Sequence, residues 1–176
     1  MKALRIILGA HLIFFGAWGF YLLTSHQAGK YVWLETMPVD PRDYISGHYV
    51  ALNFKIANVS TTKCSESTAV PGTIAYVRLG EEDQTLSVPE GVIRTWGIVD
   101  CRFDRPTGNR DETWMEGKFA NQPWRSSSFI QYGIERFYVS EGSPLRNARS
   151  GDVVAKVSIN KNFTPRIVDL VKIAKR

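Results

Sequence analysis

The chain has few of the residues that build metal and redox sites. It contains 2 cysteines and 3 histidines among 176 residues, and the histidines (His11, His26 and His48) are scattered. No Cys-x-x-Cys pair is present, whereas zinc sites need closely spaced Cys and His ligands. We therefore expect no metal site. The absence of a nucleotide or dinucleotide fingerprint likewise predicts no cofactor.

The sequence also lacks the motifs of common hydrolases. It has no Gly-x-Ser-x-Gly elbow and no phosphate-cradling glycine loop. A Ser-His-carboxylate triad would have to use His48, because His26 lies beside an N-terminal apolar run. These absences predict a protein that is not an enzyme.

Charge of one sign is not concentrated in the body of the chain. Lys and Arg number 22 against 17 Asp and Glu, for a net charge of +5, and the two signs are interspersed. A basic concentration occurs only at the C-terminus, with Lys172, Lys175 and Arg176. A nucleic-acid-binding protein would show a basic stripe or face, so we expect no nucleic-acid partner.

One long hydrophobic run is present, at the N-terminus. Between Ile6 and Leu23 there is no Asp, Glu, Lys or Arg, and His11 is the only side chain that can become positively charged. A helix of roughly 17 to 20 apolar residues crosses a bilayer. Lys2 and Arg5 precede the run and should hold the N-terminus in the cytoplasm.

The run has three possible interpretations: an uncleaved membrane anchor, a cleaved signal peptide, or a buried helix of a soluble protein. A signal peptide ends in a small-x-small cleavage site. Cleavage after Ala28 would place His26 where a small residue is required. The run therefore favours the uncleaved anchor.

We accordingly divide the chain into four parts. These are a cytoplasmic N-terminus (1–5), a transmembrane anchor in contact with the lipid bilayer (6–24), a short linker (25–30) and an exported β domain (31–176). This topology places the domain on the periplasmic or extracytoplasmic side of the inner (cytoplasmic) membrane.

The two cysteines fit an exported domain. Cys64 and Cys101 both lie beside polar, turn-like stretches. A cysteine pair in an oxidising compartment commonly forms a disulfide, which would stabilise the domain by roughly 2 to 4 kcal/mol. We predict this bridge.

After the apolar run, the periodicity is short and strand-like. In the segment 48–56, Val50, Leu52, Phe54 and Ile56 alternate with other residues and should face a core. We predict strands at 31–36, 48–56, 73–79, 85–88, 92–103, 114–119, 129–139, 152–159 and 166–173, with a hairpin turn at 80–84. This pattern predicts a mainly β fold, an antiparallel β-sandwich or a partly open barrel, preceded by one N-terminal transmembrane helix.

Two sequence blocks resemble a known family. Ser46-Gly-His-Tyr-Val-Ala-Leu-Asn-Phe54 resembles the signature of the bacterial GDYXXLXY family, with Gly47, Tyr49 and Leu52 in the family's positions. His48 stands where the family has Asp, and Phe54 stands where it has the last Tyr. The lead-in 39–43 and a second block, 132–142, are also similar to the family's pattern.

The resemblance implies a short exported protein with one N-terminal anchor. Such proteins look like companions of multi-span membrane proteins, and the family carries no assigned activity. The resemblance therefore implies an architecture and not a reaction.

The two blocks supply the candidate binding residues. They are Tyr44, Gly47, His48, Tyr49, Tyr132, Glu135, Arg136 and Tyr138. Gly47 should adopt a positive φ just before its strand.

Glu135 and Arg136 are neighbours in a predicted strand, so one of them should point inward and need a charged partner. Arg42 or Arg94 could serve Glu135, and Asp43 could serve Arg136. Such an ion pair could simply join the two blocks structurally, or the same residues could form a ligand site.

Two functions follow as expectations. The first is a non-catalytic accessory or interaction subunit of an integral-membrane or envelope complex, with a multi-span membrane protein or another envelope protein as its partner. The alternative is an envelope ligand-binding or hydrolytic module with a site around His48 and Glu135.

Overall fold

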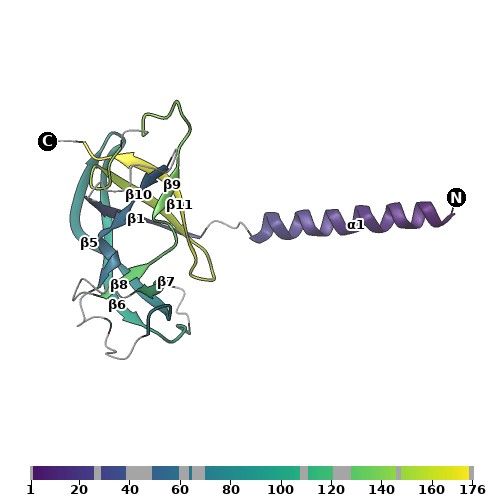
Figure 1. The fold of residues 1–176 in the computed structure, drawn as a ribbon, viewed down its shortest axis with the longest axis horizontal. Coiled ribbons are helices and arrows are strands. Elements are labelled where there is room, and N and C mark those ends of the chain that lie inside the picture. The colour runs from purple at the N-terminus through teal and green to yellow at the C-terminus, as the bar shows by residue number, and fades with distance from the viewer. Residues whose placement is uncertain are drawn as a thin grey trace.

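The computed structural model describes residues 2–25, 29–38, 49–59, 64, 70–107, 111–120, 128–145 and 148–174. In this part of the chain, one helix precedes a domain of antiparallel strands (Figure 1). The elements are α1 (Lys2–Ser25), β1 (Lys30–Met37), β2 (Tyr49–Ala51), β3 (Asn53–Phe54), the 3-10 helix η1 (Lys55–Ala57), β4 (Asn58–Val59), β5 (Ile74–Val88), β6 (Gly91–Arg102), β7 (Thr113–Ala120), β8 (Ser128–Gln131), β9 (Arg136–Tyr138), β10 (Val153–Ile159) and β11 (Pro165–Lys172).

The first sheet has four strands in the order β11-β10-β1-β3. β1 alternates, so that Val32 and Leu34 are fully buried while Tyr31 and Trp33 lie on the opposite face. The register of β1 on β10 runs without a shift from Lys30 opposite Ile159. The predicted strands at 31–36, 152–159 and 166–173 are confirmed by β1, β10 and β11.

The second sheet has five strands in the order β4-β8-β7-β5-β6. The predicted hairpin turn at 80–84 is wrong, because β5 continues through it for 15 residues. The polar residues of this stretch are used inside the strand: Glu82 accepts hydrogen bonds from Lys55 (3.2 Å) and Thr95 (3.3 Å). The chain reverses only after Val88, where Gly91 adopts a φ of 135°.

A common hydrophobic core is built from residues of all three sheets. The four predicted core residues of the segment 48–56 are all at most 4% exposed: Val50, Leu52, Phe54 and Ile56. The alternation is confirmed, but the expected single strand is wrong. The segment divides into β2, β3 and η1, and its pieces pair with different strands.

The third sheet consists of β2 and β9 alone. The predicted strand at 129–139 is also divided, into β8 and β9, which belong to different sheets. Gly133 lies between them with a φ of 77°, a left-handed conformation that glycine adopts without a steric penalty. The predicted single strand is therefore wrong, because β8 ends before this glycine and β9 begins after it.

The fold is mainly β and antiparallel, as predicted, and the described strands do not join into a closed barrel. In Figure 1, α1 projects from one side of the sheets. Within the described residues, no helix meets the length and hydrophobicity that crossing a membrane requires. The anchor at 6–24 therefore stays a prediction.

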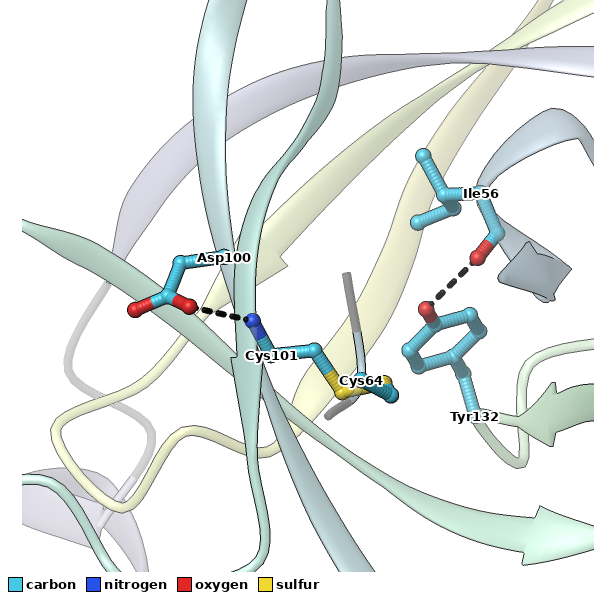
Figure 2. The surroundings of a disulfide bond; sticks show 5 residues. All are labelled: Ile56, Cys64, Asp100, Cys101 and Tyr132. Atoms are coloured by element: carbon cyan, nitrogen blue, oxygen red, sulfur yellow. Dashed lines mark hydrogen bonds between the residues drawn. A yellow bond between two sulfur atoms is a disulfide. The ribbon is translucent and has the colours of Figure 1, made fainter. Parts of the chain in front are cut away.

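The predicted disulfide between Cys64 and Cys101 is confirmed (Figure 2). The two Cα atoms are 4.8 Å apart, and each cysteine is 7% exposed. Cys101 belongs to β6, and its backbone N–H donates to the carboxylate of Asp100 at 2.9 Å. The bridge thus joins residue 64 to the edge strand of the five-stranded sheet.

Candidate functional site

The two sequence blocks meet as neighbouring antiparallel strands. In the β2–β9 ribbon, Tyr49 lies opposite Tyr138, and Ala51 lies opposite Arg136. The backbone N–H of Leu52 extends this pairing by donating to the carbonyl of Glu135 at 2.8 Å. Residues that are far apart in the sequence thus form one local unit.

The ribbon has a buried face and an exposed face. Directly paired residues of an antiparallel ribbon share a face. Val50, which is 4% exposed, and its partner Phe137 pack on the core. Tyr49 and Tyr138 therefore lie on the opposite face, and Tyr138 is 74% exposed.

The exposed face carries a cluster of two aromatic rings and a guanidinium. The ring centroids of Tyr49 and Tyr138 are 5.9 Å apart. The guanidinium carbon of Arg136 lies 5.4 Å from the centroid of the Tyr49 ring. Such a cation–π contact contributes about 0.5 to 1 kcal/mol at an exposed site. We call these three residues the Tyr49–Arg136–Tyr138 surface.

Glu135 does not belong to that surface, because its carboxylate closes the turn before β9. Its Oε1 atom accepts backbone N–H groups from Tyr132 at 2.5 Å and from Gly133 at 3.2 Å. Arg94 is one of two arginines expected to pair with Glu135. This prediction is wrong, because Arg94 pairs with Glu81 at 3.5 Å. Two backbone amides thus engage Oε1 of the half-buried carboxylate, and the predicted pairing with Arg42 lies outside the described residues.

Tyr132 lies in the core and not on a binding surface. It is 5% exposed, and its hydroxyl donates to the carbonyl of Ile56 at 2.8 Å (Figure 2). Burial, with the nearby Glu135 carboxylate as a second cause, raises the pKa of this phenol far above its usual value. Tyr132 therefore stays neutral, and its hydrogen bond to Ile56 connects the segment after β8 to η1.

Five residues that the sequence analysis named as candidate binding residues or ion-pair partners fall outside the described residues. They are Arg42, Asp43, Tyr44, Gly47 and His48. The predictions made for them, including the positive φ of Gly47 and the place of His48 in a ligand-binding or hydrolytic site, remain predictions.

Sequence reasoning missed two residues that shape the site. Gly133 turns the chain so that β9 can leave the five-stranded sheet, and a glycine inside an aromatic run was the available signal. Ala51 is the small residue opposite Arg136. Its position could not be recognised before its partner strand was known.

The described surface offers aromatic and cationic contacts and not a set of metal ligands. In the described part of the chain, no three His, Cys, Asp or Glu side chains gather as a group that could hold a metal ion. An exposed arginine stacked on one tyrosine beside a second tyrosine is suited to binding the surface of another molecule.

The fold and the site together define an antiparallel β domain with two sequence blocks paired in one ribbon. The family model described as GDYXXLXY protein matches residues 12–170, which include both blocks. The chain belongs to the GDYXXLXY family, as its sequence resemblance predicted. Neither the comparison with curated proteins nor that with solved structures gives a match.

Proposed function

We propose that the protein is a membrane-anchored, non-catalytic accessory subunit of an integral-membrane or envelope complex. Its β domain would lie on the extracytoplasmic side and bind a partner through the Tyr49–Arg136–Tyr138 surface. The observation that carries this proposal is the pairing of the two family blocks, which presents an exposed tyrosine and arginine on one face.

The exposed apolar surface of α1 supports the anchor. The large apolar side chains of this helix between residues 6 and 21 are 55% or more exposed. His11 is accommodated within the helix, because its Nδ1 donates to the carbonyl of Ile7 at 2.9 Å.

The disulfide supports the extracytoplasmic side. Disulfides form and persist in oxidising compartments and are rare in the cytosol. Cys64 and Cys101 are bridged, and the positively charged Lys2 and Arg5 stand before the apolar run. Both features favour a topology with the N-terminus in the cytoplasm and the β domain outside it.

The composition of the surface supports a binding role. Tyrosine and arginine are enriched among the residues that contribute most to protein–protein binding. Arg136 is held over Tyr49 before any partner arrives, so less side-chain entropy is lost on binding. In contrast, the carboxylate of Glu135 is engaged by two backbone amides, which favours the interaction role over a catalytic one.

Co-purification of the full-length chain from membranes in a mild detergent tests the proposal. We expect a specific membrane or envelope protein to accompany the chain. Tyr138→Ala and Arg136→Ala should each reduce its recovery about tenfold or more, the loss of roughly 1.4 kcal/mol or more that truncating such a residue causes. Tyr138→Phe should retain the partner, because it keeps the ring.

Arg94→Ala is the matched control, since Arg94 is an exposed strand arginine outside the surface. If Tyr138→Ala and Arg136→Ala recover the partner as well as Arg94→Ala does, the surface is not the binding site. If the full-length chain is released from membranes by alkaline carbonate, the anchor is refuted.

A further inference from the structure

The start of the β domain is held close to the end of α1. The helix ends at Ser25, and Gly29 is already fixed to the sheet by donating its N–H to Ser158 Oγ at 3.2 Å. A Cβ on Gly29 would overlap the carbonyl oxygen of Ile159, which shows how closely the backbones pack. Consecutive Cα atoms are 3.8 Å apart, so the Cα atoms of Ser25 and Gly29 lie within about 15 Å.

An aromatic and basic surface lies beside that start. Tyr31 pairs with Ser158, which pairs with Arg166, and Trp33 pairs with Lys156, so these side chains share the outer face of the four-stranded sheet. Two carboxylates lie on this face as well: Asp169 is opposite Lys156, and Glu35 on β1 is paired with Lys55. We call Tyr31, Trp33, Lys156 and Arg166 the Tyr31–Trp33 face.

The lysine and the two rings of this face form one unit. Nζ of Lys156 lies 5.4 Å from the ring centroid of Tyr31 and 5.6 Å from that of Trp33. Tyr31 is 48% exposed, and Arg166 is exposed at the start of β11.

Tyr31 and Trp33 are aromatic side chains that keep a polar group, and Lys156 and Arg166 are cations. Tryptophan and tyrosine are enriched at the membrane–water interface, and each Lys or Arg near an anionic leaflet contributes attraction. Because the linker holds this face within a short distance of the helix end, a bilayer that contains α1 must come close to it.

We propose that the Tyr31–Trp33 face rests on the headgroups of an anionic lipid leaflet, so that the β domain is seated on the membrane. This inference rests on the proposed anchor. The occupant is the phospholipid surface itself: Arg166 lies at the end of the face nearest the start of β1, where it would meet anionic headgroups, and the rings of Tyr31 and Trp33 suit the headgroup region.

Fluorescence quenching on the full-length chain in lipid nanodiscs tests this proposal. The described cysteines are disulfide-bonded, so an introduced cysteine can be labelled selectively with bimane. One label replaces Val168 on β11, which is 49% exposed near Arg166. The control label replaces Val92, which is 71% exposed.

Val92, on β6 of the five-stranded sheet, lies near the end of the four-stranded sheet that is opposite the start of β1. It pairs with Ser87, and the carbonyl of Ser87 accepts the N–H of Ala174, which follows the end of β11. The nanodiscs contain phosphatidylglycerol and phosphatidylcholine, part of the latter carrying a nitroxide on its headgroup as quencher.

We expect the bimane at position 168 to be quenched about twofold or more relative to position 92, because the stretch from position 168 to Ala174, whose N–H is bound by Ser87, separates the two sites by about 20 Å. Arg166→Glu should reduce the quenching at position 168. Lys118→Glu, which makes the same charge change on exposed Lys118 of the other sheet, should leave it unchanged.

Three results would overturn the proposal, and each points to a different failure. If the chain does not incorporate into the discs, the anchor and the seating both fail. If it incorporates but positions 168 and 92 are quenched equally, the anchor stands and the seating is wrong. If quenching at 168 is unaffected by Arg166→Glu and by replacing phosphatidylglycerol with phosphatidylcholine, the face does not recognise anionic lipid.

Discussion

Arg136 lies over the ring of Tyr49, with its guanidinium carbon 5.4 Å from the ring centroid, and so connects the two family blocks through their side chains. The two residues are diagonal neighbours on the β2–β9 ribbon, because Arg136 is paired with Ala51 and Tyr49 is paired with Tyr138. Diagonal neighbours on one face are within reach of long and aromatic side chains. The contact therefore follows from the register of the ribbon.

This contact should be measurable as a coupling energy. In a double-mutant cycle of Arg136→Ala and Tyr49→Leu, urea unfolding in mild detergent should give a coupling of about 0.5 to 1 kcal/mol. A cycle of Arg136→Ala with the distant Val92→Ala should give none. Equal coupling in both cycles would show that the cation–π contact contributes nothing to stability.

Tyr132→Phe should destabilise the domain. The variant removes the hydroxyl that donates to the carbonyl of Ile56 inside the core, and a buried acceptor left unpaired costs about 1 to 3 kcal/mol. Tyr138→Phe removes the hydroxyl of a 74% exposed tyrosine and should change the free energy of unfolding by less than about 0.5 kcal/mol. Denaturant titration of both variants compares them, and equal values would contradict the buried bond.

Gly133→Ala should also be destabilising, for a conformational reason. No atom lies within 4 Å of a Cβ built on Gly133, but its φ is 77°. An alanine in this left-handed conformation costs about 1 to 2 kcal/mol per residue. Gly142→Ala is the matched control, because it has equally open space and no such φ. A Gly133→Ala variant as stable as Gly142→Ala would show that the turn tolerates a side chain.

Acid should weaken the domain partly through Asp100. The hydrogen bond from Arg102, at 3.0 Å, is the largest cause that lowers the pKa of Asp100 below its usual 3.8. A carboxyl group with a lowered folded-state pKa stabilises the fold above its unfolded pKa, and this contribution is lost as the pH falls through the folded pKa.

Thermal unfolding at several pH values between about 5 and 2 checks this expectation, since that range spans the ordinary titration of an aspartate. In the Asp100→Asn variant, the stability should fall less steeply toward low pH than in the wild type. In the Asp104→Asn variant, which changes an exposed aspartate, it should fall as steeply as in the wild type. An Asp100→Asn curve parallel to that of the wild type would contradict the role of Asp100.

Reduction of the disulfide should lower the free energy of unfolding by about 2 to 4 kcal/mol. Cys64 and Cys101 are 37 positions apart, so the bridge restricts a long loop of the unfolded chain. A variant with both cysteines replaced by alanine should be as weak as the reduced protein and insensitive to reductant. A wild-type protein whose unfolding curve is the same with and without reductant would refute this effect.

The alternation at Val50, Leu52 and Phe54 shows how much of the fold could be predicted. Each of these side chains is buried as expected, because burial of alternate residues depends on the local backbone period alone. The stretch 80–84 shows the opposite case. Its polar residues are typical of a turn, but Glu82 is bound by Lys55 and Thr95, and these partners could not be identified from neighbours in the sequence.

The candidate site was predicted in part. The sequence pointed to Tyr49, Arg136 and Tyr138, and the structure brings these three together on one face. Tyr132 and Glu135 were expected beside them, but the turn at Gly133 directs one into the core and the other to backbone amides. A strand pattern assumes an extended backbone, so a single residue with positive φ changes which face every later side chain occupies.

The sequence by itself determined the local properties of this protein: a long apolar run before the domain, a β-rich composition with alternating burial, and one cysteine pair available for bridging. Only the tertiary structure decided that β2 pairs with β9, that β8 and β9 belong to different sheets, and that Arg136 meets Tyr49. The reason is physical. A strand's period is set by its own backbone, whereas its partner is set by the path of the whole chain and by the core that all the strands share.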